Sequence, residues 1–300
     1  MSDERPQITQ AMIDLYDHFT HVAGNRRDLI IGMAKLAGGT AAALALLPLI
    51  EARAEAASLT SDTDPKLVND RMVFALPNGT RMVAYVSYPA RGTSRAPKVM
   101  VIHENRGLTE HIRDVTRRLA LAGFVAMAPD FLSPLGETPR NGDGKTSADD
   151  IARAMIGTLD PAQTVANAVA TLKWFDDYSQ GHGKPGAVGF CWGGGLVNNL
   201  AIAAGPALRT GVAYYGPAPA DLTGASRVKA RMLLHFAGLD ERINTRGKEW
   251  ADALKAAGVK VESFVYPDVN HAFNNDTSEA RFNQAAADLA WGRTLAALKL

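Results

Sequence analysis

The stretch Ala187-Val-Gly-Phe-Cys-Trp-Gly-Gly194 joins a short apolar run to a glycine-rich turn, and an apolar segment follows it. Within it, Gly189-Phe-Cys191-Trp-Gly193 has the G-x-nucleophile-x-G pattern of a nucleophile elbow, with cysteine where serine usually stands. A strand that turns this sharply into a helix leaves no room for side chains two residues on either side of the nucleophile, so glycine is required there. The pattern predicts that the Cys191 sulfur stands above a sheet, at a helix N-terminus whose dipole favours a thiolate.

Short apolar runs alternate with amphipathic segments on both sides of this motif. Pro77-Asn-Gly79 separates two of the runs and predicts an antiparallel hairpin at the start of the sheet. This alternation indicates an α/β fold with a mostly parallel sheet and helices on both faces. The expected strands are 71–76, 80–88, 98–102, 124–129, 187–190, 211–215, 231–236 and 259–266, and the expected helices are 110–122, a segment capped by Asp160, the segment after Cys191, and about 278–297.

The composition excludes several classes of function. The chain has 300 residues, of which 47% are hydrophobic and 21% charged, as is typical of a globular protein. Lys and Arg number 32 against 31 Asp and Glu, so no positive excess is present to neutralise nucleic-acid phosphates. Because Cys191 is the only cysteine, an intrachain disulfide and a C-x-x-C zinc or redox pair are excluded.

The N-terminal 56 residues have a pattern of their own. Leu29–Ile50 is apolar except for Lys35, which leaves 15 uncharged residues, fewer than the roughly 20 that a stable membrane span needs. Arg26-Arg27 precedes this run, and small residues in an A-x-A arrangement follow it at 52–56. This order resembles a twin-arginine export signal and predicts cleavage after Ala56 and a periplasmic protein.

The alternative interpretation is a helical arm that stays attached to a cytoplasmic protein. Such an arm would pack on the body or on a second copy of the chain, which would make the protein a homo-oligomer. In both interpretations residues 57–300 form one α/β domain, since no linker or internal repeat divides them. The arm is supported by apolar residues at helical spacing that a signal does not require, namely Ile8, Met12, Leu15, Tyr16 and Phe19.

A second glycine pattern, Gly181-His-Gly183-Lys-Pro-Gly186, matches the dinucleotide fingerprint G-x-G-x-x-G. That fingerprint must follow a strand and open a helix. Here it precedes the 187–190 strand and contains Pro185. We therefore interpret it as a loop.

An elbow nucleophile needs a base and an orienting acid, which follow it in the chain in the order acid, then histidine. His271 lies in a loop after the 259–266 strand, where an imidazole can reach back to the thiol. The other histidines fit less well: His18 and His21 lie in the N-terminal segment, His103 and His235 lie at apolar strands, and His111 and His182 precede Cys191.

Asp240 is the expected acid, because it falls just past the 231–236 strand and between Cys191 and His271. Asp268 is only three residues from His271 and is better explained as shaping its own turn. Glu241 is the other rival.

Glu104 closes the apolar run 98–103, directly before Asn105-Arg106-Gly107. A surface carboxylate is the simplest explanation. The loop at this position also supplies the second amide of the oxyanion hole in elbow enzymes, the first coming from the residue after the nucleophile. We therefore expect the backbone N–H groups of Trp192 and Asn105 to hold the developing oxyanion.

Together these segments resemble the dienelactone hydrolase (carboxymethylenebutenolidase) family, cysteine-dependent members of the α/β-hydrolase fold, over roughly residues 66–298. The resemblance implies hydrolysis of an enol-lactone through a cysteinyl acyl-enzyme, with Glu104 helping to control thiol ionisation when substrate enters. It also implies no metal and no organic cofactor. The matching segments are Ile102-His-Glu-Asn-Arg-Gly107, Ala122-Gly-Phe-Val-Ala-Met-Ala-Pro-Asp130, Gly189–Gly194, Ala237-Gly-Leu-Asp240 and Asn270-His-Ala-Phe273.

The chain departs from the family pattern at one place. Well-known members carry a substrate-binding arginine a few residues after the catalytic histidine, and here Asn274 and Asn275 occupy that stretch. Arg106 and Arg242 are the candidates to bind a substrate carboxylate instead, although an exposed arginine is more often only a solubilising charge.

The expected function is hydrolysis of a small activated ester or lactone. In this mechanism the Cys191 thiolate attacks the carbonyl, His271 moves the proton, and Asp240 orients the imidazole. The alternative is a non-catalytic thiol protein that reacts stoichiometrically with oxidants or electrophiles. A serine esterase is disfavoured, because the chain contains no G-x-S-x-G.

Overall fold

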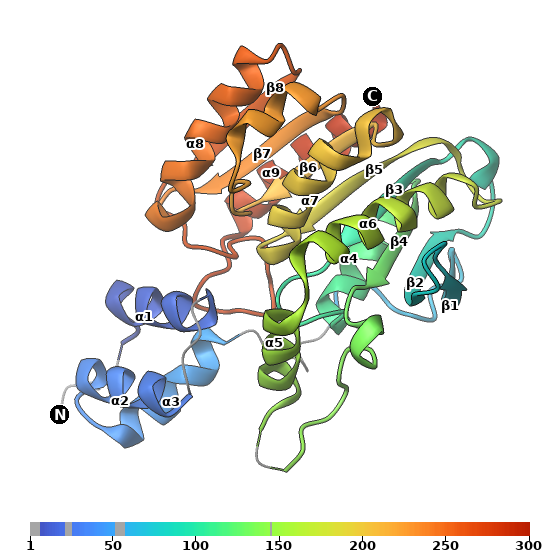
Figure 1. Ribbon diagram of the computed structural model, residues 1–300. Coiled ribbons are helices and arrows are strands. Elements are labelled where there is room, and N and C mark those ends of the chain that lie inside the picture. Colours follow the sequence, from blue (N-terminus) through green and yellow to red (C-terminus); the bar gives the residue numbers. More distant parts are fainter. Residues whose placement is uncertain (1–6, 22–25, 52–57, 145) are drawn as a thin grey trace.

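The computed structural model describes residues 7–21, 26–51, 58–144 and 146–300 (Figure 1). Within these residues eight strands form one sheet in the order β1-β2-β4-β3-β5-β6-β7-β8. β2 pairs antiparallel with β1 and with β4, and the other neighbours are parallel. The strands are β1 (Leu67–Ala75), β2 (Arg81–Pro89), β3 (Pro97–Ile102), β4 (Val125–Asp130), β5 (His182–Phe190), β6 (Thr210–Tyr214), β7 (Arg231–Ala237) and β8 (Val261–Tyr266).

Helices cover both faces of the sheet, and an apolar core fills each side. Alternate residues of β3 enter opposite cores, since Met100 and Ile102 pack with α6, α7 and α8, whereas Val99 and Val101 pack with α4 and α9. The predicted α/β class, with its opening hairpin and mostly parallel sheet, is confirmed. The helices are α1 (Gln10–His21), α2 (Arg26–Ala37), α3 (Thr40–Ile50), α4 (Glu110–Leu121), α5 (Ala148–Thr158), α6 (Pro161–Asp176), α7 (Trp192–Ala204), α8 (Glu241–Ala256) and α9 (Gln284–Lys299).

Local sequence signals fix several helix ends. Asp160 caps α6, its side chain accepting a hydrogen bond from the backbone N–H of Gln163 at 2.6 Å, and Pro161 occupies the first turn. After α4 the chain reverses at Gly123, whose φ of 95° suits glycine. These boundaries follow the predicted ones.

The structure corrects three expectations. The segment 182–186, interpreted as a loop, belongs to β5: Pro97 pairs with His182 and Val99 with Gly186, so a bulge absorbs the extra residues and Pro185. The closing helix begins at Gln284 rather than near 278, because Asn283 caps it. Helices α5 and α8 were not foreseen.

Helices α1, α2 and α3 lie together beside α5 and the segment that joins β8 to α9 (Figure 1). They share an apolar core of their own that includes Met12, Tyr16, Met33 and Leu46. No described helix is by itself long and apolar enough to cross a membrane, while α2 and α3, bent by 108° at their junction, pass that test only as a pair. The arm is therefore folded as a small helical layer on the body.

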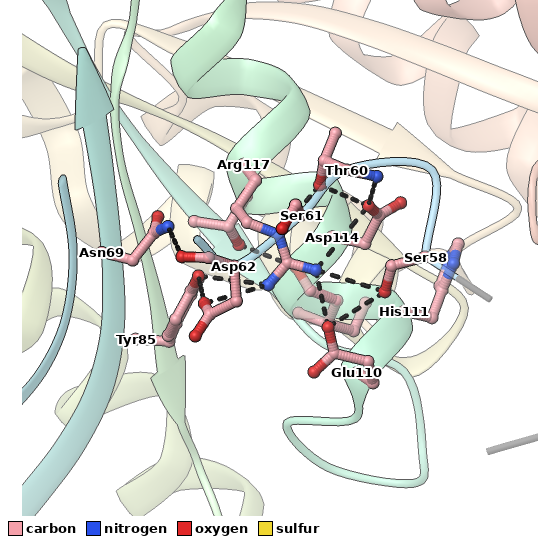
Figure 2. Close-up of polar contacts among 12 residues, drawn as sticks. Ser58, Thr60, Ser61, Asp62, Asn69, Tyr85, Glu110, His111, Asp114 and Arg117 are labelled. Atoms are coloured by element: carbon pink, nitrogen blue, oxygen red, sulfur yellow. Dashed lines mark hydrogen bonds and ion pairs between the residues drawn. The ribbon is translucent and has the colours of Figure 1, made fainter. Parts of the chain in front are cut away.

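A buried guanidinium anchors the chain where it enters the body (Figure 2). Arg117 of α4 is 1% exposed, and it donates to the hydroxyls of Thr60 and Tyr85 at 2.8 and 3.1 Å and to Glu110 at 2.6 Å. Thr60 in turn donates through its backbone N–H to Asp114 at 2.8 Å. Residues from Ser58 onward are thus tied to α4.

Candidate active site

The residues expected to carry the chemistry meet at one edge of the sheet. Cys191 follows β5, Asp240 follows β7 and His271 follows β8, and these strands are parallel to one another. Glu104 lies just past the end of the parallel strand β3. Because the carboxyl ends of parallel strands share an edge, residues far apart in sequence come together there.

The turn at Cys191 has the geometry of an elbow. Its φ of 54° lies in the left-handed region, which a non-glycine residue adopts only under constraint, and α7 begins at the next residue. A methyl group on Gly189 would lie 2.2 Å from the carbonyl oxygen of Gly193, and one on Gly193 would lie 2.4 Å from the carbonyl oxygens of Ile102 and His103. Both glycines are therefore required sterically.

His271 is held between Asp240 and Cys191. Its Nδ1 lies 2.5 Å from the Asp240 carboxylate, and the ring is close enough to Cys191 for the two groups to interact electrostatically. Burial by itself would lower the pKa of His271, but the charges of Cys191 and Asp240 and the hydrogen bonds to both raise the pKa to about 10. Such a ring is poised to hold the thiol proton. Of the two rival acids, Asp268 lies in the turn before His271 with a φ of 56°, and Glu241 is the first residue of α8.

The thiol is sheltered rather than exposed. Cys191 is 5% exposed and packs in the core cluster that contains Phe190 and Tyr214, and His271 is 2% exposed. Burial of a lone thiol is common and does not by itself indicate function. Cys191 also has a strained backbone and lies beside an ion-paired imidazole.

Glu104 is buried, at 8% exposure, instead of lying on the surface. Asn275 donates its side-chain N–H to Glu104 Oε2 at 2.9 Å. Asn275 belongs to the stretch where the family pattern has arginine, so an uncharged donor holds the carboxylate here.

The two residues whose amides were expected in the oxyanion hole border a cavity of about 1460 Å³. Trp192 and Asn105 line it, together with Arg242 and with residues of α1, α5 and α6, whereas Cys191 and His271 are absent from its described lining. Trp192 stacks on the buried ring of His103, with centroids 5.3 Å apart. The cavity thus borders the elbow at Trp192, the residue after Cys191.

The two candidate arginines differ in their surroundings. Arg106 is buried, and its guanidinium contacts the hydroxyl of Tyr16 and, at 3.3 Å, Asp149. Arg242 is 37% exposed, lies 3.7 Å from Asp240 and lines the cavity. Of the two, only Arg242 belongs to the described lining of the cavity.

The remaining histidines lie outside the Cys191–Asp240 contacts. His103 and His235 are fully buried, as expected, and burial lowers the pKa of both, that of His235 to about 3. His111 faces Asp276 at 3.2 Å. His18 is on α1, His182 opens β5, and the side chain of His21 lies outside the described residues. Among the described residues no group of three or more His, Cys, Asp or Glu could hold a metal ion.

Sequence reasoning missed Tyr215 at the end of β6. Its ring lies 4.8 Å from that of His271, its φ is 37°, and its buried hydroxyl has no hydrogen-bond partner among the described residues. Burial, and after it the charges of Glu104 and Cys191, raise the pKa of this phenol well above its usual value. Its place at a strand's carboxyl end was the available signal.

Comparison with known proteins identifies the chain. The sequence profile described as "Dienelactone hydrolase family" matches residues 82–300. The chain belongs to the dienelactone hydrolase family. It is therefore a hydrolase with an α/β-hydrolase fold, as the sequence motifs predicted.

Individual relatives agree with this family. "Putative carboxymethylenebutenolidase" of Escherichia coli O157:H7 is 33% identical over 229 residues, which cover 72% of this chain and 82% of that protein. A protein of the same name from Methylorubrum extorquens is 30% identical over 270 residues, 85% of this chain and 87% of its own. The crystal structure of a "Putative Dienelactone Hydrolase" from Klebsiella pneumoniae superimposes with a TM-score of 0.67 at 28% identity, covering 78% of this chain and 98% of that one.

Proposed function

We propose that this dienelactone hydrolase-family enzyme hydrolyses an activated ester or lactone through a thioester on Cys191. The observation that carries the proposal is the series of neighbours that runs from the Cys191 elbow through His271 to Asp240. In this series the Nδ1 of His271 lies 2.5 Å from the Asp240 carboxylate. The names of the relatives, which refer to a lactone hydrolase, support the same substrate class.

In the first half-reaction the thiolate attacks the carbonyl carbon, and the leaving alkoxide or enolate takes a proton from the His271 imidazolium. The backbone N–H groups of Trp192 and Asn105 hold the oxyanion as it develops. Water then hydrolyses the thioester, with His271 as base, and the thiol is restored. Leaving groups that are poor, as in simple alkyl esters, are disfavoured, because the tetrahedral intermediate expels the thiolate before the alkoxide.

A carboxylate on the substrate is matched by Arg242, which lines the cavity. We assign Arg106 no direct contact with substrate, since its guanidinium is engaged by Tyr16 and Asp149. Replacing Arg242 by Gln is expected to raise KM for a carboxylated lactone and to leave an uncharged ester unaffected.

The deciding experiment compares wild type with Cys191→Ala on a panel of lactones and 4-nitrophenyl esters, with and without iodoacetamide. Loss of a triad member lowers turnover by orders of magnitude. Activity that survives in Cys191→Ala contradicts the assignment. A single stoichiometric burst of 4-nitrophenol without turnover would instead favour a thiol protein that reacts once with electrophiles.

For residues 1–56 we propose that α1–α3 remain part of the working enzyme. Supporting this, the backbone carbonyls of Leu49 and Ile50 accept hydrogen bonds from Ala280 and Ser278, in the segment after His271. The predicted cleavage region 52–56 lies outside the described residues. Export to the periplasm stays a prediction, and an N-terminus after Ala56 in protein from the native host, measured by mass spectrometry, would overturn the retained arm.

A further inference from the structure

Helix α1 touches both loops that carry the proposed chemistry. The side-chain N–H of Asn105, in the Glu104 loop, donates to the carbonyl of Thr20 at 2.9 Å. Gln10 donates to the side chain of Asn270, the neighbour of His271, at 2.5 Å. Helix α1 also lines the cavity through Phe19 and Thr20. The N-terminal helix is thus a wall of the site.

Tyr16 lies at the centre of this contact and is fully buried. Its hydroxyl accepts a hydrogen bond from Arg106, two residues after Glu104. The guanidinium of Arg281 lies over the Tyr16 ring in a cation–π contact, with its central carbon 5.2 Å from the ring centroid. One side chain therefore binds an arginine from the Glu104 loop and an arginine from the segment after His271.

Each arginine has an acidic partner away from the triad. Arg106 lies 3.3 Å from Asp149, and Arg281 lies 3.1 Å from Asp17 on α1, with the two guanidinium side chains 8% and 6% exposed. Buried guanidinium groups are costly unless they are fully paired, so their positions are tightly set.

The charges of these arginines act on the site itself. Burial by itself would lower the pKa of Arg106, but its neighbours Tyr16, Asp149 and Glu104 raise it above its usual value. The positive charge of Arg281 and the negative charges of Glu104 and Cys191 all act on the phenol of Tyr215. Arg106 thus lies in the electrostatic surroundings of Glu104, and Arg281 in those of Tyr215, whose ring contacts His271.

We propose that Tyr16 is a positioning residue of the active site, which holds Arg106 and Arg281 against the two catalytic loops and thereby sets the reactivity of Cys191. The inference rests on the proposed function, because it assigns Tyr16 a role in tuning that thiol. A fixed positive charge near a cysteine favours the thiolate. Without the Tyr16 hydroxyl, Arg106 loses one of the contacts that fix its guanidinium in the Glu104 loop.

The test uses the full chain and the variant Tyr16→Phe, which removes the hydroxyl that binds Arg106 and keeps the ring beneath Arg281. The matched control is Tyr85→Phe, which also removes a buried hydroxyl bonded to a buried arginine, Arg117, at 3.1 Å. Tyr85 lies on β2, a strand that leads to none of the proposed catalytic residues, and its hydroxyl contacts Arg117 (Figure 2). The readouts are kcat, KM and the rate of iodoacetamide alkylation against pH, which reports Cys191 alone because the chain has one cysteine.

We expect Tyr16→Phe to move the midpoint of the alkylation profile upward by about 0.5 to 1 pH unit, the lower end of the effect of a nearby opposite charge. Alkylation at pH 7 should then slow by about three- to tenfold, and kcat should fall while KM changes little. Tyr85→Phe should keep the wild-type profile. Tyr16→Leu, which also removes the ring, should shift the midpoint further.

Two results would overturn the inference. One is an alkylation profile and kcat for Tyr16→Phe that match those of the wild type. The other is an equal shift in both variants, which would show a general loss of stability rather than positioning. Failure of the proposed function is a separate outcome, since it would appear as cysteine-independent turnover in Cys191→Ala, whatever Tyr16→Phe does to alkylation.

Discussion

Replacing Gly193 by Ala tests the proposed elbow through its tightest contact. The added methyl would lie 2.4 Å from the carbonyl oxygens of both Ile102 and His103, about 1 Å closer than an ordinary contact of about 3.5 Å. Because both neighbours are backbone atoms at the end of β3, no side chain can turn aside to make room. Helix α7 must therefore move away from β3.

This overpacking is expected to cost about 3 kcal/mol of unfolding free energy, the upper end of the range for well-packed sites. The effect on catalysis should be larger, because the same movement displaces the N–H of Trp192 from that of Asn105. A shift of about 1 Å in a catalytic group costs on the order of 100-fold in rate. We expect kcat/KM for 4-nitrophenyl acetate to fall about 100-fold in protein that is still folded.

Urea denaturation and steady-state kinetics on the same preparation measure both quantities. Gly292→Ala is the matched control, since Gly292 lies inside α9 with nothing within 4 Å of the added methyl. Alanine is the better helix former, so this variant should gain about 0.5–1 kcal/mol and keep full activity. If Gly193→Ala were as stable and as active as Gly292→Ala, the close packing of α7 on β3 and its role in the oxyanion hole would both be wrong.

Three further predictions follow from buried charges and hydroxyls. The pKa of His271 is raised from 6.5 to about 10, so its charge contributes stability that is fully present below pH 6.5 and is lost as the pH rises through 10. In urea titrations Asp240→Asn should therefore lower the unfolding free energy by about 2 kcal/mol more at pH 6 than above pH 10, and equal losses would refute the coupling. Burial would raise the pKa of Asp276, but contacts with His111 and Arg118 lower it to about 2, so the stability that this carboxylate contributes is present above about pH 3.8 and is lost toward pH 2. Asp276→Asn should lower the unfolding free energy by about 1 kcal/mol at pH 7, allowing for solvent screening, and leave it unchanged near pH 2, as measured by circular dichroism. Tyr215→Phe removes a buried hydroxyl without a described partner, so it should raise the unfolding free energy by up to about 1 kcal/mol, and a loss of stability would reveal a bond to that hydroxyl.

Much of the fold could be predicted because the strands of this sheet are short apolar runs with clear turn residues between them. The exceptions have local causes. In α8 the buried residues Ile243, Trp250 and Leu254 have helical spacing, but Gly247 interrupts the pattern, and it is tolerated because the helix packs there against Phe236. The start of β5 was predicted as a loop because proline and two glycines are typical of loops. Its pairing with β3 becomes visible only in the folded sheet.

The candidate site was predictable to the extent that it depends on strand ends. Cys191, Asp240 and His271 each follow a strand, and the structure brings them into contact. The environment of Arg106 was not predictable, since it depends on Tyr16, 90 residues earlier, and on Asp149. Helical spacing identified Tyr16 as apolar-facing, but only tertiary packing shows that its hydroxyl binds an arginine.

The docking of the N-terminal helices has a consequence for synthesis of the chain on the ribosome. Gln10 and Asp17 bind Asn270 and Arg281, partners that are 260 and 264 residues later. At a translation rate of about 5–20 residues per second, roughly 13–50 s pass between the emergence of the first helices and that of the surface that receives them. During that interval the helices lack the surface on which they dock, so their outer faces stay exposed until the last third of the chain has folded.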